Sequence, residues 1–131
     1  MRKFKGLIIM LSILASLFGM TACSGGGANY YEQITPEQAK TIMDTESEYI
    51  IIDARTDEEF AEGHIADAIL IPEYEIAARA EKELPDKEQL ILVYCRSGRR
   101  SKIASEELVK LGYTNVKEFG GIIDWPYEVV K

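Results

Sequence analysis

The sequence of 131 residues has few of the residues that build metal sites, disulfide frameworks or nucleic acid interfaces. One histidine and two cysteines are too few for a four-ligand zinc site of the usual kind, and two cysteines allow no more than one disulfide. Basic residues are outnumbered, with 15 Lys and Arg against 22 Asp and Glu. We therefore exclude nucleic acid as a partner, because phosphate binding needs a basic face. The hydrophobic fraction of 47%, in a chain of one domain's length, indicates a folded protein.

A long hydrophobic run is missing as well. The apolar stretch 7–18 has 12 residues, whereas a transmembrane helix needs about 20. It follows a positive segment with Arg2, Lys3 and Lys5 and precedes small residues, which is the layout of a secretory signal peptide. We predict that residues 1–22 are a signal peptide; an uncleaved N-terminal anchor is the alternative.

The residues around Cys23 suggest how the chain is attached to a membrane. Met20-Thr21-Ala22-Cys23 resembles the lipobox of bacterial lipoproteins, in which the cysteine receives a diacylglyceryl group and becomes the new N-terminus. The resemblance implies lipidation of Cys23 and a place in the bacterial cell envelope, outside the cytoplasm. A chance cysteine after an ordinary signal peptide is the alternative. Residues 23–29, rich in glycine, are predicted to be a flexible tether.

Residues 30–131 alternate short apolar runs with helical patterns. Thr35 with Gln38, and Thr56 with Glu59, predict capping boxes at two helix starts, and Gly112 predicts a Schellman helix end. This alternation indicates an α/β domain with a mainly parallel five-stranded sheet flanked by helices, and we expect a monomer. Strands are expected near 30–34, 49–53, 68–71, 90–94 and 116–119, and helices near 36–44, 57–63, 74–84, 100–111 and 122–130.

A basic loop follows the strand predicted at 90–94. Residues 89–105 contain four basic residues and no acidic one, whereas the rest of residues 23–131 has 8 basic and 22 acidic residues. Cys95 comes directly after the strand, where open α/β sheets bind ligands. The start of a helix, the turn at Gly98 and three arginines all favour the thiolate, which is the nucleophilic form of cysteine. The same charge would attract an anionic substrate; a buried, inert cysteine beside a solvated turn is the alternative.

The segment Cys95-Arg96-Ser97-Gly98-Arg99-Arg100-Ser101 resembles the active-site loop of the rhodanese family of sulfurtransferases. Two further blocks agree with this family: Asp53-Ala54-Arg55 with Glu59-Phe60 and Gly63-His64-Ile65, and Gly120-Gly121-Ile122 with Trp125. Together the blocks span about residues 30–126 and imply a rhodanese-like domain. Ala66-Asp67, where the family often has Pro and Gly, and the lack of a glycine after Trp125 are departures that leave the Cys95 loop untouched.

The resemblance implies that Cys95 takes a sulfane sulfur from thiosulfate or a similar donor, becomes a persulfide and passes the sulfur to cyanide or a thiol. It implies no cofactor. Asp53, His64 and Trp125 are expected to support the loop. Asp53 and Arg55 could brace the loop as an ion pair or lie at the substrate, and both alternatives stay open. The residues expected at the substrate are Arg96, Ser97, Gly98, Arg99, Arg100, Ser101 and Arg55.

Other functions remain open at this point. A cysteine-based phosphatase or arsenate reductase can share the fold, but it needs five residues between cysteine and arginine, and Arg100 is already the fifth residue after Cys95. A persulfide carrier or redox relay would use the same Cys95 and hand the sulfur to a protein partner. A pure interaction module typically lacks the cysteine. A Cys–His dyad with His64 is a further possibility, although the matching histidine in the family supports a turn.

Overall fold

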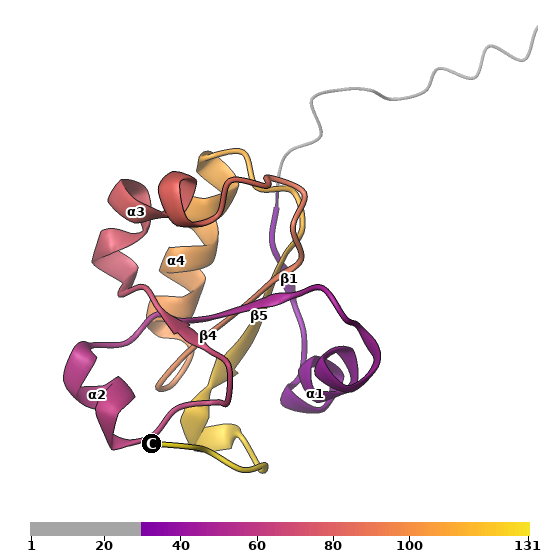
Figure 1. Cartoon of the computed structure of the whole chain (residues 1–131), viewed down its shortest axis with the longest axis vertical. Coiled ribbons are helices and arrows are strands. Elements are labelled where there is room, and N and C mark those ends of the chain that lie inside the picture. Colours follow the sequence, from indigo (N-terminus) through magenta and orange to yellow (C-terminus); the bar gives the residue numbers. More distant parts are fainter. Residues whose placement is uncertain (1–29) are drawn as a thin grey trace, which may run out of the picture.

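The computed structural model describes residues 30–131 (Figure 1). The predicted signal peptide and tether, with Cys23, lie outside the described residues. Within the described part, no helix combines the length and the hydrophobicity needed to cross a membrane.

Five parallel strands form one sheet, as predicted. In spatial order they are β1 (Glu32–Gln33), β5 (Val116–Gly121), β4 (Ile91–Cys95), β2 (Ile50–Asp53) and β3 (Ile69–Leu70). All five residues of the central strand β4 are buried, which explains why its sequence is continuously apolar rather than alternating. Because the strands are parallel, their carboxyl ends meet along one edge of the sheet.

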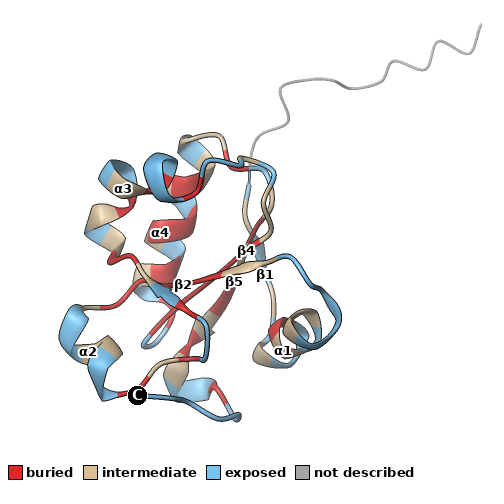
Figure 2. Ribbon diagram, viewed as in Figure 1, coloured by how far each residue is buried: buried red, intermediate tan, exposed pale blue. Residues whose placement is uncertain are grey.

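Helices cover both faces of the sheet. These are α1 (Pro36–Thr45), α2 (Asp57–Glu62), α3 (Ile76–Glu83) and α4 (Arg99–Lys110), with short 3-10 turns η1 (Glu73–Glu75) and η2 (Ile122–Asp124). Helices α3 and α4 pack on one face and α1 on the other, as Figures 1 and 2 show. Each face has its own apolar core, with Ala104 and Leu108 of α4 in one and Ala39 of α1 in the other. The fold is therefore a three-layer arrangement with a buried sheet.

The predicted helix signals are present, with one exception. At α1 both halves of the capping box form, since Thr35 Oγ1 accepts from the Gln38 N–H (3.1 Å) and Gln38 Oε1 accepts from the Thr35 N–H (2.9 Å). At α2 Thr56 Oγ1 accepts from the Glu59 N–H (3.3 Å), but the Glu59 carboxylate accepts from the Thr56 hydroxyl and from Arg100 instead of completing a box. The second box is half formed because Glu59 has another partner.

The end of α4 follows the predicted Schellman geometry. Gly112 has φ +99°, a left-handed conformation that favours glycine. The Tyr113 N–H donates to the Leu108 carbonyl (3.1 Å), and the Gly112 N–H donates to the Val109 carbonyl (3.0 Å). These bonds satisfy carbonyls that the end of a helix leaves free.

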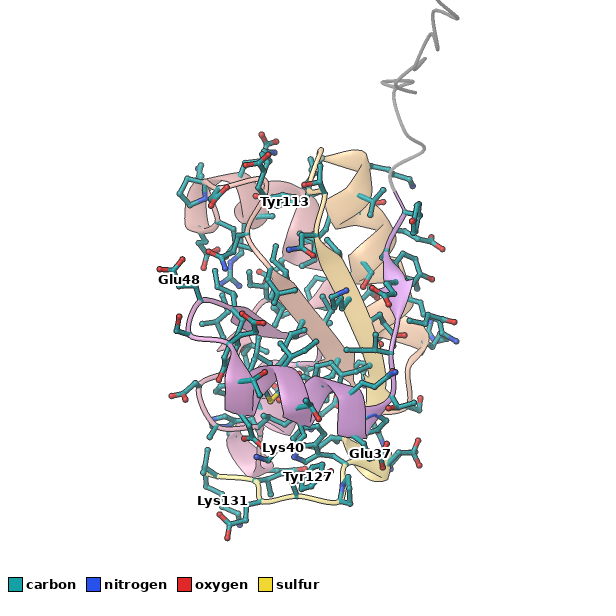
Figure 3. The ribbon with its side chains drawn as sticks, turned by 90° about the vertical axis from the view of Figure 1, so that its right-hand side faces the viewer. Glu37, Lys40, Glu48, Tyr113, Tyr127 and Lys131 are labelled. Carbon is teal, nitrogen blue, oxygen red and sulfur yellow. The ribbon has the colours of Figure 1, made fainter. Side chains whose placement is uncertain are left out.

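The prediction of a helix over residues 122–130 is wrong. Only the turn η2 forms, and Trp125 has φ −82° and ψ 110° because the ring of Pro126 disfavours a helical residue before it. The tail then runs back to α2, where Val130 and His64 exchange two backbone hydrogen bonds (2.9 and 2.8 Å). On the way, Tyr127 lies beneath Lys40 of α1, whose Nζ is 5.6 Å from the ring centroid (Figure 3). The C-terminal residues therefore form an extended segment, which two backbone hydrogen bonds hold beside His64.

Candidate active site

Cys95 lies at the carboxyl edge of the sheet, at the centre of the site. It is the last residue of β4, so the strand ends one residue later than the sequence predicted. The residue is 1% exposed and carries a free thiol. Neighbouring side chains of a strand point to opposite faces, so Cys95 faces the α3–α4 layer while Tyr94 faces the α1 layer.

The loop after Cys95 turns at Gly98 to bring a backbone amide onto the sulfur. Gly98 has φ +104° and is the N-cap of α4; an L residue would pay about 1–2 kcal/mol for this left-handed conformation. Its N–H donates to Cys95 Sγ at 3.0 Å. The sulfur therefore lies against the positive end of the α4 dipole, where a negative charge is stabilised.

A buried serine and a buried glutamate continue from the sulfur into the protein. Cys95 Sγ is 3.3 Å from Ser101 Oγ, whose hydroxyl donates to Glu118 Oε1 at 2.7 Å. The Gly120 N–H donates to the same carboxylate oxygen at 2.8 Å. Ser101 was predicted at the site, but sequence reasoning missed Glu118. Side chains alternate along β5, so Glu118 lies on the same side of the sheet as the buried Val116. The signal in the sequence was an acidic residue at a strand position whose side chain is expected to be buried.

The three loop arginines have different roles in the structure. Arg96 and Arg99 are exposed and make no ion pair among residues 30–131. Arg100, by contrast, donates two hydrogen bonds to the Glu59 carboxylate, at 2.6 and 2.9 Å. These bonds lower the pKa of Glu59 to about 2, against the raising effect of its burial. Arg100 thus ties the first turn of α4 to α2, while Arg96 and Arg99 can reach an anion in solution.

The Glu59–Arg100 pair should make the stability of the domain sensitive to acid. The pKa of Glu59 lies below its ordinary value of 4.5, so the stabilisation is complete above that pH and is lost as the pH falls toward about 2. Glu59→Gln should lower the free energy of unfolding by about 1 kcal/mol at neutral pH. Urea unfolding of both proteins from about pH 7 to about pH 2 measures this. A difference that does not shrink in acid would contradict the assignment.

Asp53 and Arg55 form a buried ion pair beside the loop. Arg55 Nη2 donates to Asp53 Oδ2 and to the Gly63 carbonyl, both at 2.7 Å. The Tyr94 hydroxyl also donates to Asp53 Oδ2 (2.7 Å) and accepts from the Ile65 N–H (3.0 Å). Burial, together with the Asp53 charge, raises the pKa of Tyr94 above its usual range. The structure places Arg55 within this network, and its assignment to the substrate stays a prediction.

His64 and Trp125 lie in packing positions. The His64 ring stacks on Phe60 with centroids 3.7 Å apart, and its Nδ1 is 3.0 Å from the Phe60 carbonyl oxygen. The Trp125 ring packs on Phe119, 5.5 Å between centroids, in the core of the α1 layer. The thiol of Cys95 has Ser101 and Gly98 as partners instead of His64. Among the described residues, no three His, Cys, Asp and Glu side chains gather as a metal site would require.

Comparison with known proteins agrees with this geometry. The sequence profile of the Rhodanese-like domain matches residues 35–126. Thiosulfate sulfurtransferase PspE of Escherichia coli (strain K12) is 40% identical over 80 residues, which are 61% of this chain and 77% of that protein. A sulfurtransferase of Allochromatium vinosum is 40% identical over 88 residues, 66% of this chain and 79% of that protein. A solved structure described as rhodanese with anions from E. coli is 38% identical with a TM-score of 0.60, and the match covers 63% of this chain and 98% of that one.

Proposed function

Because the chain belongs to the family of rhodanese-like domains, we propose that it is a sulfurtransferase that moves a sulfane sulfur from thiosulfate or a similar anionic donor to a thiophilic acceptor through a persulfide on Cys95. The observation that carries the proposal is the position of Cys95 Sγ, held at 3.0 Å by the Gly98 N–H at the start of α4. The two relatives named above are sulfurtransferases by name, which supports the same reaction class.

The reaction has two halves. In the first, the Cys95 thiolate attacks the outer sulfur of thiosulfate; a bond forms between the two sulfurs, the bond to the sulfite sulfur breaks, and sulfite leaves with the electron pair. In the second, cyanide or a thiol in its thiolate form attacks the outer sulfur of the persulfide; a bond forms to that sulfur, its bond to Cys95 Sγ breaks, and Cys95 leaves as the thiolate with the electron pair. The Gly98 amide stabilises the charge on the sulfur, and the exposed Arg96 and Arg99 suit the sulfonate end of the donor.

The half-reactions give a direct test. Thiosulfate alone should add the mass of one sulfur atom to the Cys95 peptide, and cyanide should remove it and release thiocyanate. A Cys95 that stays unmodified would argue against the proposal. A persulfide that forms but is removed neither by cyanide nor by a small thiol would favour the carrier function, in which a protein partner takes the sulfur.

We also infer that the domain is tethered to a membrane of the bacterial envelope by a lipid on Cys23. The support is the order of the sequence features, from a positive segment through an apolar stretch to Met20-Thr21-Ala22-Cys23 and a glycine-rich spacer. The described domain begins at Tyr30, just before the amino end of β1, whereas Cys95 is at the carboxyl end of β4 in the same parallel sheet. A tether at residue 30 would leave the Cys95 loop facing away from its attachment point.

A further inference from the structure

Three side chains form a continuous buried chain from the reactive sulfur. The contacts are 3.3 Å from Cys95 Sγ to Ser101 Oγ and 2.7 Å from Ser101 Oγ to Glu118 Oε1. Cys95 and Glu118 are 1% and 3% exposed, and Ser101 is fully buried. The reaction above uses the sulfur but assigns nothing to Glu118. This glutamate is buried, and among residues 30–131 no cationic side chain is hydrogen-bonded to it, which is unusual for a buried carboxylate.

The single hydrogen of the Ser101 hydroxyl fixes the direction of the hydrogen bonds from Cys95 to Glu118. A serine hydroxyl has one hydrogen, and the shortest contact of Ser101 is to the Glu118 carboxylate, the strongest type of acceptor nearby. With that hydrogen directed at Glu118, a lone pair of Ser101 Oγ faces Cys95, and the thiol donates to it. The direction of donation therefore runs from thiol to hydroxyl to carboxylate.

Glu118 is also one of the residues that line a crevice. A crevice of about 260 Å³ is lined by Glu118 together with Ser97, Lys102 and Asp124. Two ionisable groups near these three side chains, Lys102 of α4 and Asp124 of η2, lie at this crevice. The pKa of Arg100 is raised chiefly by Glu59 and also by Cys95. The pKa of Tyr31, which precedes β1, is raised by burial and by the charges of Glu106 and Glu118. Glu118 is thus linked to the sulfur through Ser101 and belongs to the lining of this crevice.

We propose that Glu118 receives the thiol proton of Cys95 through the hydroxyl of Ser101. The S–H bond breaks and its proton goes to Ser101 Oγ, while the proton of Ser101 goes to Glu118 Oε1, leaving a thiolate and a neutral carboxylic acid. One negative charge is buried before the step and one after it, so the step avoids two adjacent buried anions. The inference builds on the proposed function, in which this thiolate attacks the donor; when the persulfide is discharged to a thiol, the proton returns by the same route.

The proposal predicts the shape of a pH profile. Two coupled groups that share one proton titrate in two steps, so a fixed fraction of Cys95 should be thiolate between them. Iodoacetamide alkylation of Cys95 in the full chain, followed on the Cys95 peptide by mass spectrometry, should show a shoulder on the acid side of its main rise. An isolated thiol would instead lose about ten-fold in rate for each pH unit. The readout needs no sulfur donor, so it is independent of whether the protein transfers sulfur.

Variants separate the relay from a mere effect of charge. In Glu118→Gln the shoulder should vanish and the profile should become a single step, because Cys95 is then the only member of the pair that titrates. In Ser101→Ala, which keeps the carboxylate but removes the hydroxyl that links it to the sulfur, the shoulder should shrink. Asp124→Asn, which removes a carboxylate from the same crevice, should keep the shoulder. The proposal is overturned if the wild-type profile has a single step, which decides the matter even if a variant does not fold. It is also overturned if Glu118→Gln moves the profile to lower pH without changing its shape, as a purely repulsive charge would.

Discussion

Replacing Cys95 with serine should lower the rate of sulfur transfer from thiosulfate to cyanide by at least about 1,000-fold, or about 4 kcal/mol of barrier. In the proposed reaction the step depends on a thiolate, which attacks a sulfane sulfur and forms a bond that the other half-reaction can break. A serine hydroxyl stays protonated and forms no persulfide. The serine oxygen would still have the Gly98 N–H and Ser101 as hydrogen-bond partners, so the free energy of unfolding should change by no more than about 1 kcal/mol.

The second cysteine provides the matched control for this experiment. Thiocyanate release and thermal unfolding should be measured on Cys95→Ser and on Cys23→Ala side by side. Cys23→Ala should keep the transfer rate but lose membrane association, because its proposed role is attachment. Transfer by Cys95→Ser at the wild-type rate would mean that another nucleophile carries the sulfur. Membrane association that survives in Cys23→Ala would favour an uncleaved N-terminal anchor over the lipid.

The parts of the site that follow one another along the chain could be predicted from the sequence. An apolar run that ends at Cys95, a glycine three residues later and a helical pattern after it are local signals, and the structure joins them as expected in β4, Gly98 and α4. The Schellman end of α4 at Gly112 is local in the same way. Such features depend on backbone conformations that each residue type favours, so few neighbours are needed to read them.

The parts that depend on distant partners could not be predicted. Ser101 and Glu118 are 17 residues apart, and Glu59 and Arg100 are 41 apart; which of the many acidic residues meets which donor follows from the strand order and not from spacing. This is also why three similar loop arginines have different roles. The error at residues 122–130 has another cause, since Pro126 is a local signal that outweighs the apolar spacing around it.

Gly121→Ala should lower the transfer rate by at least about 100-fold and the free energy of unfolding by about 3 kcal/mol. Gly121 ends β5 opposite Cys95, where the register of β4 and β5 shifts. A Cβ on Gly121 would lie 2.5 Å from Ser97 Cα and closer still to the carbonyl group of Arg96. These are backbone atoms of the Cys95 loop, so the clash cannot be relieved by rotating a side chain. The loop must move, and with it the Gly98 N–H that holds the sulfur.

The neighbouring glycine separates this clash from backbone strain. Gly121 has φ −122° and ψ 155°, which alanine adopts freely, so the cost of Gly121→Ala is steric. Gly120 has φ +88° with no atom within 4 Å of an added Cβ, so Gly120→Ala meets only the left-handed penalty of about 1–2 kcal/mol and should keep most of the activity. Denaturant unfolding and thiocyanate release on both variants test the contrast. If Gly121→Ala kept the wild-type rate, the close approach of β5 to the Cys95 loop would not be what holds the loop in place.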